Sequence, residues 1–373
     1  MRYKHINSKF SHLSFFINRD ELFVWSKPKK HLYGFKGFAA AVFLYVDEFY
    51  DNYKGIFEYF DYVSKDDLEK VLINVLNIIE DTEEKEIEKI KKKPKLLKIS
   101  EFKYRFFFSV ENEKFLIEFN DESLFFILPF FKHLKCTDNN YDTVVSIVEF
   151  ENGYEIYANK ELIKTVKEKK AILPLLNDTL RLIHYQNEEF LIAMHSALLM
   201  KNDTALFLPG VSMSGKSTLC SYLAFKGFEV FSDELAVIDK EGFILPLPFG
   251  MTIKEGSWEI ISQIKDLTNI MTHMRFDGQK VKVFSPPKTA FKKEKPKKYV
   301  FVFPKYDKNS STVLSKLSVI EAVESFVKSG YHIVDADDFE KVSLWLKILS
   351  VSEIYSLTYS DIKEAYHVIN GFF

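Results

Sequence analysis

The sequence predicts an α/β protein with a phosphate-binding loop in its C-terminal part, a β-rich segment before it and a small α+β domain at the N-terminus. Three observations lead to this fold class. Strand, glycine-rich turn and helix alternate after residue 190, aromatic and β-branched residues dominate residues 101–150, and helical periodicity marks the first 95 residues. The chain has 373 residues, enough for two or three domains of about 100–200 residues each.

The composition excludes several classes of protein. Lys and Arg number 51 and Asp and Glu 53, so the net charge of −2 provides no positive field for nucleic acid. Apolar runs such as Ala39–Val46 are far shorter than the roughly 20 residues of a membrane-spanning helix, and the first ten residues lack the apolar segment of a signal peptide. Cys136 and Cys220 form no spaced framework. We therefore expect a reduced, cytoplasmic protein that binds neither nucleic acid nor membrane.

The N-terminal part, residues 1–95, reads as a strand followed by helices. Glu21–Trp25 is a short apolar strand, and the alanine-rich run Phe38–Tyr50 is typical of a buried helix. A capping-box variant at Ser64–Asp67 opens a helix that ends before the charged run Glu80–Lys98. The apolar face of this helix consists of Leu68, Val71, Leu72, Val75, Leu76 and Ile79. The pattern predicts a small winged-helix-like domain, separated by the charged run from a second domain over residues 100–373.

The second domain begins with β-structure. Phe102–Val110, Lys114–Phe119 and Thr143–Phe150 are rich in aromatic and β-branched residues, and Asn152-Gly153 is a hairpin signal. A helix is expected over Leu173–His184.

A complete phosphate-binding motif follows. The residues GVSMSGKS, from Gly210 to Ser217, match G-x-x-x-x-G-K-[ST]. They lie between the apolar strand Ala205–Leu208 and a helix over Lys216–Lys226 that Gly227 ends. In such a loop, backbone N–H groups at a helix N-terminus favour an anion, the lysine reaches the β- and γ-phosphates, and the serine hydroxyl ligates Mg²⁺. We expect ATP·Mg²⁺ to bind here; the contacting residues are Gly210, Ser212, Ser214, Gly215, Lys216, Ser217 and Thr218.

Two acids follow the next strand, Phe228–Phe231. Asp233 and Glu234 are expected in the ligand crevice at the strand's carboxyl end, where one carboxylate can hold Mg²⁺ and the other can accept a proton from an attacking hydroxyl. The alternatives are a helix N-cap or a solvated pair. His195, on or beside the strand before the loop strand, is by position alone an ordinary core histidine.

In their order, these residues resemble the HPr kinase/phosphorylase superfamily and its HPr-kinase-related kinases. The similarity runs from His195 through GVSMSGKSTL at 210–219 to FSDELAVID at 231–239, and continues in LPLPFGMTIK at 245–254 and VFVFPKYD at 300–307. The resemblance implies a P-loop core related to phosphoenolpyruvate carboxykinase and transfer of the γ-phosphate of ATP to a serine hydroxyl. It assigns Asp233 as general base, Glu234 as the acid near the metal, and His195 as a supporting group. The position of Asp233 at the end of a strand also predicts that its carboxylate faces the γ-phosphate across the crevice.

The sequence departs from the bifunctional enzymes of that family. They have two adjacent aspartates where this chain has Asp233 and Glu234, and their glycine-rich C-terminal signature is not found. We therefore expect a kinase acting on Ser or Thr of a protein or ribosomally made precursor peptide, without naming HPr as the acceptor. A small-molecule hydroxyl kinase and a nucleotide-gated binding module without transfer are the alternatives. A homo-oligomer stays open.

Three further features bear on partners. LFVW at 22–25, LYGFKGFAAAVFLYVDE at 32–48 and the helix at 65–80 resemble PqqD-like domains, in which a three-helix bundle with a small sheet binds a precursor peptide by strand addition. The lysine-rich segment Pro286–Lys298 is a solvated loop or, alternatively, a cover over the ATP site. Arg181 and Arg275 are the candidate arginines for a phosphate contact.

Overall fold

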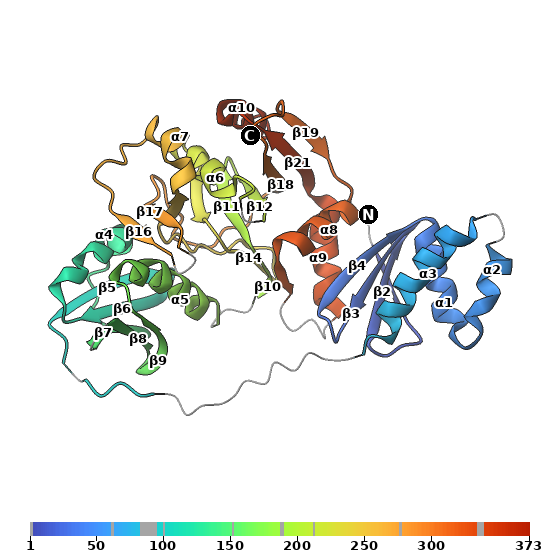
Figure 1. Ribbon diagram of the computed structural model, residues 1–373, viewed down its shortest axis with the longest axis horizontal. Helices are drawn as coiled ribbons and strands as arrows, with labels where there is room; N and C mark the ends of the chain where they lie inside the picture. Colours follow the sequence, from blue (N-terminus) through green and yellow to red (C-terminus); the bar gives the residue numbers. More distant parts are fainter. Residues whose placement is uncertain are drawn as a thin grey trace.

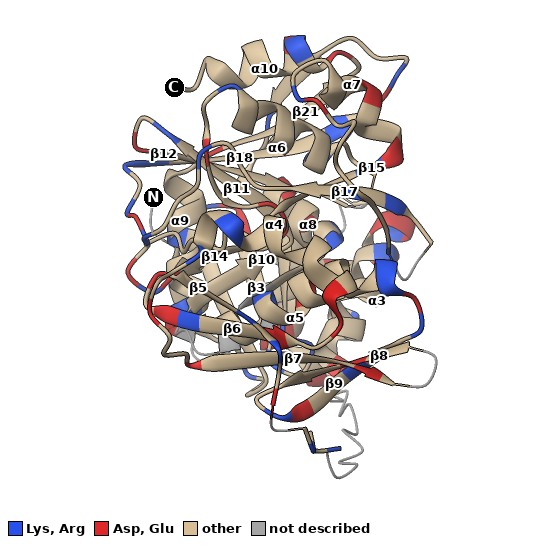
Figure 2. Ribbon diagram, turned by 90° about the vertical axis from the view of Figure 1, so that its left-hand side faces the viewer, with Lys and Arg blue, Asp and Glu red and all other residues tan. Residues whose placement is uncertain are grey.

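A computed structural model describes residues 3–60, 63–82, 95–99, 101–150, 153–186, 190–211, 213–275, 278–333 and 339–373. The chain is a mixed α/β protein with several sheets (Figure 1), as the sequence predicts at this level. Acidic and basic residues are interspersed over its elements (Figure 2), consistent with the net charge of −2. Among the described helices, none combines the length and the apolar character needed to cross a bilayer.

The N-terminal part is a four-stranded antiparallel sheet followed by helices. The strands pair in the order β1-β2-β3-β4. Their bounds are β1 Lys4–Asn7, β2 Leu13–Asn18, β3 Glu21–Ser26 and β4 His31–Lys36. The helices are α1 Phe38–Glu48, α2 Ile56–Tyr59 and α3 Lys65–Glu80, with the 3-10 turn Tyr50–Gly55 between α1 and α2.

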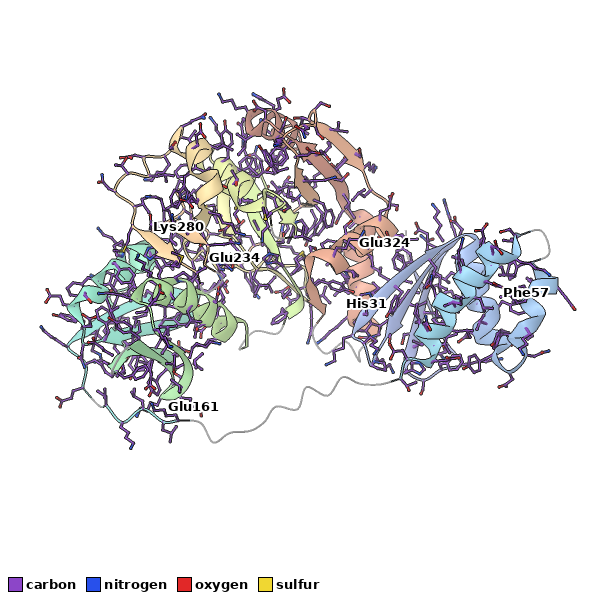
Figure 3. The ribbon with its side chains drawn as sticks, viewed as in Figure 1. His31, Phe57, Glu161, Glu234, Lys280 and Glu324 are labelled. Atoms are coloured by element: carbon purple, nitrogen blue, oxygen red, sulfur yellow. The ribbon has the colours of Figure 1, made fainter. Side chains whose placement is uncertain are left out.

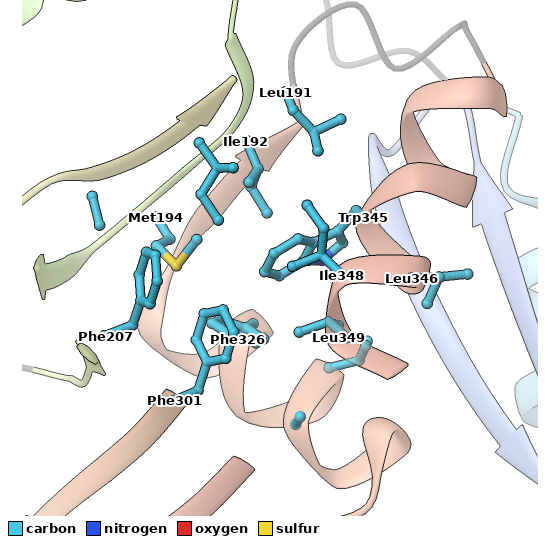
Figure 4. Packing of buried hydrophobic residues seen from close by; sticks show 14 of the residues in the cluster. Leu191, Ile192, Met194, Phe207, Phe301, Phe326, Trp345, Leu346, Ile348 and Leu349 are labelled. Atoms are coloured by element: carbon cyan, nitrogen blue, oxygen red, sulfur yellow. The ribbon is translucent and has the colours of Figure 1, made fainter. Parts of the chain in front are cut away.

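Both faces of this N-terminal sheet are buried. Because side chains alternate along a strand, Phe15 and Leu22 point to one face and pack with α1 and α3. Phe16, Phe23 and Trp25 point to the other face and join the core of the C-terminal part. Figure 1 shows this sheet beside α8 and α9, and Figure 4 shows the adjoining core, with Trp345 of α9 against β10. The N-terminal part therefore shares a hydrophobic core with the rest of the chain.

The sequence predicts two of these helices and one strand correctly. β3 and α1 lie where expected, and α3 begins after Ser64, whose side chain accepts a hydrogen bond from the Asp67 N–H. The N-terminal part does not have the expected winged-helix-like arrangement. Instead, four strands precede all its helices and form one antiparallel sheet, where the sequence predicts a single strand. Strands β1, β2 and β4 were not predicted, since short runs such as LSFFIN show no clean alternation of apolar and polar residues.

The β-rich segment forms its own five-stranded sheet in the order β5-β6-β7-β8-β9, antiparallel except where β6 runs parallel to β7. The predicted strands and helix are confirmed, and β7 and β8 form the predicted hairpin, whose Asn152 lies outside the described residues. The bounds are β5 Tyr104–Val110, β6 Glu113–Phe119, β7 Thr143–Phe150, β8 Gly153–Ala158, β9 Glu161–Val166, the short helix α4 Leu128–Phe131 and α5 Ile172–Gln186.

The remaining elements surround a mixed six-stranded sheet in the order β13-β11-β12-β18-β21-β19. Its strands are β11 Ser196–Lys201, β12 Thr204–Pro209, β13 Glu229–Ser232, β18 Lys298–Tyr306, β19 Val313–Lys316 and β21 Glu353–Tyr359. Two smaller sheets, β14-β10-β20 and β15-β17-β16, flank it. Their strands are β10 Phe190–Met194, β14 Ala236–Asp239, β15 Met251–Lys254, β16 Thr272–Met274, β17 Lys280–Phe284 and β20 Tyr331–Ile333. The helices are α6 Lys216–Phe225, α7 Trp258–Ser262, α8 Val319–Ser329, α9 Phe339–Val351 and α10 Ile362–Asn370.

Candidate functional site

The strand–loop–helix unit around the glycine motif has the predicted form. β12 leads into the loop and α6 begins at Lys216, with Leu219, Tyr222 and Leu223 buried as expected. At the other end, Gly227 has a φ of +92°, and the N–H groups of Gly227 and Phe228 donate to the carbonyl oxygens of Ala224 and Leu223. This is the helix-ending motif that requires a left-handed residue, so glycine is needed there.

Glycine is also needed at the other helix end. Gly215, the N-cap of α6, has a φ of +88°, and a Cβ there would lie 2.4 Å from the hydroxyl of Tyr359. The loop therefore follows a path that only glycine permits, with the N–H groups of the first turn of α6 left for a ligand. Ser214 is buried, and in the described part of the chain its Oγ has no hydrogen-bond partner. An unpaired polar atom beside a glycine-lined loop fits a phosphate-binding cradle.

The sheet topology brings several strand ends to this loop. β12, β18 and β21 are mutually parallel, and β13 has the same direction because both β12 and β13 run antiparallel to β11. Their carboxyl ends therefore meet at one edge, which is where ligands bind in open α/β sheets. β13 is separated from β12 by β11, so the chain passes over one strand between the loop strand and the strand that leads to Asp233 and Glu234.

A cavity of about 660 Å³ opens at this edge. Figure 3 shows Glu234 and Lys280, which both line it, where the β5–β9 part meets the rest of the C-terminal part. We distinguish two walls of this cavity by the composition of their side chains. The charged wall comprises His195, Lys216, Glu234 and Arg275, and the aromatic wall comprises Val211, Met213, Tyr306, Tyr359 and Ile362.

Lys216 lies at the centre of the charged wall. Its side chain is almost fully buried, and Nζ lies 3.0 Å from Nε2 of His195. Burial lowers the pKa of Lys216, although Asp233 and Glu234 oppose the shift. His195 lies between β10 and β11, where the chain passes from one sheet to another. Burial and the nearby Lys216 lower the pKa of His195 to about 4, so its ring is neutral at pH 7 and its Nε2 can accept the hydrogen bond from the ammonium group.

The two neighbouring acids differ sharply in their surroundings. Asp233 is fully buried and does not line the cavity. Its Oδ2 accepts the Thr252 N–H at 2.9 Å, while Oδ1 has no hydrogen-bond partner among the described residues. Burial and the neighbouring Glu234 raise the pKa of Asp233 to about 6. The expectation that Asp233 faces the crevice is therefore not met in this structure, because Glu234 takes that place and Asp233 lies behind it.

Two arginines hold Glu234. Arg181 of α5 approaches Oε2 to 2.5 Å with Nη1, and Arg275 approaches Oε1 to 3.7 Å. Burial alone would raise the pKa of Glu234, but Arg181, Lys216 and Arg275 together lower it to about 2. The arginines selected from the sequence as phosphate contacts thus both bind an acid of the site. Because Arg181 belongs to α5, the β-rich segment supports the charged wall through its ion pair with Glu234.

The remaining candidates are placed as follows. Gly215, Ser217 and Thr218 line the cavity, and Thr218 Oγ1 lies 2.5 Å from Ser257 Oγ. Gly210, the first residue of the loop, does not line the cavity, and a Cβ there would lie 2.5 Å from the Ser214 Oγ. Ser212 lies outside the described residues. No residue of the lysine-rich segment Pro286–Lys298 lines the cavity. Its lysines instead pair with acids elsewhere, among them Lys288 with Glu229, Lys293 with Asp239 and Lys297 with Asp203.

The described residues contain no cluster of three or more His, Cys, Asp or Glu side chains that could hold a metal by themselves. Mg²⁺ does not require such a cluster, because it is commonly held by one or two protein oxygens together with substrate phosphates and water. The Ser217 hydroxyl and the Glu234 carboxylate both line the cavity, so they suit such a site.

Sequence reasoning missed the aromatic wall. Tyr306 ends β18 and Tyr359 ends β21, and the signal was available in the rule that ligands gather at the carboxyl ends of parallel strands. It could not be applied because the order and direction of these two strands were unknown from sequence.

A scan of the chain against family models and a search of curated proteins both find no match.

Proposed function

We propose that this protein is an ATP-dependent kinase that transfers the γ-phosphate to a hydroxyl group, and that the acceptor is a Ser or Thr of a protein or ribosomally made peptide. The observation that carries the proposal is geometric: the complete glycine-rich loop, Lys216 and Glu234 line one cavity, and Asp233 is buried beside Glu234. The pKa values of the two adjacent acids diverge there, that of Asp233 raised to about 6 and that of Glu234 lowered to about 2. Such divergence is typical of a site in which one acid accepts a proton and the other stays ionised.

In this proposal, the loop N–H groups and Lys216 bind the phosphates of ATP. The acceptor hydroxyl oxygen forms a bond to the γ-phosphorus as the bond to the β,γ-bridging oxygen breaks, so that ADP leaves. Asp233 takes the hydroxyl proton, for which a pKa near 6 suits a neutral medium. Ser217 and Oε1 of Glu234 would hold Mg²⁺, which supplies positive charge to the transferring phosphoryl group.

Lys216 has two partners available in this arrangement. Nζ lies 3.0 Å from Nε2 of His195, and the buried charge of Lys216 is balanced by Asp233 and Glu234. A triphosphate offers a stronger, charge-assisted partner. Asp233 has no exposed surface, so proton transfer requires the side chains in front of it to move when substrates bind.

The N-terminal domain supports the choice of a peptide acceptor through its sheet and three α-helices, the composition implied by the PqqD-like resemblance. It is linked to the site by hydrogen bonds. The Leu32 N–H on edge strand β4 donates to the Tyr331 hydroxyl, Tyr331 lies opposite Met194 in the β10–β20 pair, and the His195 N–H donates to the Gly330 carbonyl oxygen.

A second candidate, a nucleotide-gated binding module without transfer, is favoured by one observation: the proposed base is fully buried. A labelled-phosphate transfer assay separates the two. The wild type, Asp233→Asn and a control, Asp266→Asn at an exposed carboxylate outside the cavity, are incubated with γ-labelled ATP·Mg²⁺ and fractionated extract of the source cell.

For a kinase, we expect label in an acceptor with wild type and Asp266→Asn, and about 10²–10⁴-fold slower transfer with Asp233→Asn. Binding of ATP by the wild type without label in any peptide, protein or small alcohol would favour the binding module. Full transfer by Asp233→Asn would show that another group is the base.

A further inference from the structure

Tyr306 and Tyr359 of the aromatic wall lie on the other side of the glycine-rich loop from the two acids. In the sheet, β18 and β21 follow β12 on one side, whereas β11 and β13 lie on the other. A triphosphate whose reacting end faces Glu234 therefore extends its other end toward Tyr306 and Tyr359.

Exposed apolar side chains gather on this wall. Tyr306 is 45% exposed, Val211 49% and Met213 85%, and all three line the cavity. Most large apolar side chains of the chain are buried in its core, so exposed apolar groups around one cavity indicate a surface that binds an apolar or aromatic ligand. None of the four residues of the charged wall binds these three side chains. Their exposed apolar surface suits van der Waals contact with a flat aromatic ring.

Tyr306 is held firmly beside the loop. Its backbone N–H donates to the Ser214 carbonyl oxygen at 2.9 Å, and its ring lies 5.8 Å from the Tyr359 ring at 70°, an edge-to-face contact. Tyr359 is itself buried, and its hydroxyl donates to the Gly215 carbonyl oxygen at 3.2 Å. The loop that would hold the phosphates and the Tyr306 ring are thus fixed relative to each other, as a bound nucleotide requires.

We propose that the aromatic wall is a nucleobase site, in which Tyr306 stacks on the purine ring of the nucleotide while Val211, Met213 and Ile362 cover its edges. This inference rests on the proposed function, because it places the base of the same nucleotide. Stacking on an aromatic side chain is tolerant of base identity, and Ser360, which also lines the cavity, supplies a polar group at its border.

The test separates the base from the phosphates. Binding of ATP and of inorganic tripolyphosphate, each with Mg²⁺, is measured by calorimetry for wild type, Tyr306→Ala and Tyr306→Phe. Stacking predicts that Tyr306→Ala weakens ATP binding by about tenfold or more, that its tripolyphosphate affinity stays within about twofold of wild type, and that Tyr306→Phe keeps the ATP affinity. Met213→Ala should weaken ATP binding less than Tyr306→Ala, since methionine does not stack.

Equal ATP binding by wild type and Tyr306→Ala would overturn the base site. Equal losses for ATP and tripolyphosphate would also overturn it, because the substitution would then act on the loop. If wild type bound tripolyphosphate as tightly as ATP, the proposed nucleobase site would be overturned, while phosphate binding by the loop would stand. If wild type bound neither, the proposed nucleotide function would fail with it.

Discussion

On the charged wall of the cavity each ionised side chain already has a partner within the protein, whereas on the aromatic wall the side chains that meet solvent are apolar. Lys216 lies against His195, and Glu234 lies between two arginines. Tyr306 and Met213 instead expose apolar surface at the same cavity. In the proposed kinase, the two walls therefore have different roles. The charged wall supplies the ionised groups for phosphoryl and proton transfer, and the aromatic wall supplies binding energy without taking part in proton transfer.

The largest expected effect concerns the support of the charged wall by the N-terminal domain. Deletion of residues 1–95 would expose the α8–α9 surface that Phe16, Phe23, Trp25 and Leu32 now cover. At about 1.5–3 kcal/mol for each large apolar side chain, the loss is about 6 kcal/mol or more, enough to unfold many domains. We expect the truncated chain to be insoluble or to melt far below the full chain in calorimetry. A truncated chain with an unchanged Tm would show that the domain is only tethered.

A second prediction concerns the pH dependence of transfer. Asp233, with a pKa of about 6, must be deprotonated to accept a proton, so the rate should rise as pH increases through 6 and fall below it. Glu234, with a pKa of about 2, stays ionised throughout that range and should add no second step. A rate profile of wild type between pH 4.5 and 8.5 tests this. A rate independent of pH near 6 would contradict the role of Asp233.

Glu234→Gln should destabilise the fold by about 1–3 kcal/mol, because the buried guanidinium of Arg181 would lose its closer charged partner and keep only Asp178, at 3.9 Å, among the described residues. Thermal melting measures the effect. The pKa of Glu234 is lower in the folded state than in the unfolded state. Its contribution to the free energy of unfolding is therefore fully present above the pKa of an unfolded glutamate and is lost as pH falls toward 2. The difference in Tm between wild type and Glu234→Gln should therefore shrink in acid. A difference that grew in acid would contradict the ion pair.

The smallest effect is expected at the contact between the N-terminal domain and β20. Tyr331→Phe removes the hydroxyl that accepts the Leu32 N–H, at a cost of about 1 kcal/mol. Tyr355→Phe, which removes a long, half-buried hydrogen bond to Glu353, is the matched control. Denaturant unfolding of both variants gives the comparison. Equal free energies of unfolding for Tyr331→Phe and wild type would show that this hydrogen bond does not stabilise the fold.

The sequence predicts the strand–loop–helix geometry of the glycine-rich loop well and the surroundings of the loop less well, for a physical reason. Loop residues are fixed by local rules, such as the positive φ of Gly215 and Gly227, and these rules can be applied to a short segment. Whether Asp233 or Glu234 faces the cavity depends on Thr252 and Arg181, which are distant in the chain. The sequence also could not predict that both faces of the N-terminal sheet are buried. Apolar residues on both faces of a strand do not indicate which element packs against each face.

Calorimetric titration with ATP·Mg²⁺ tests the central claim most directly, because the proposal gives each wall a role in binding the same nucleotide. Wild type and Lys265→Ala, a control at an exposed lysine outside the cavity, should bind one ATP per chain. Lys216→Ala should bind it at least about tenfold more weakly, since a charge-assisted contact to phosphate is lost, with an unchanged far-ultraviolet circular dichroism spectrum. Absence of ATP·Mg²⁺ binding by the wild type, or equal binding by Lys216→Ala, would contradict the account.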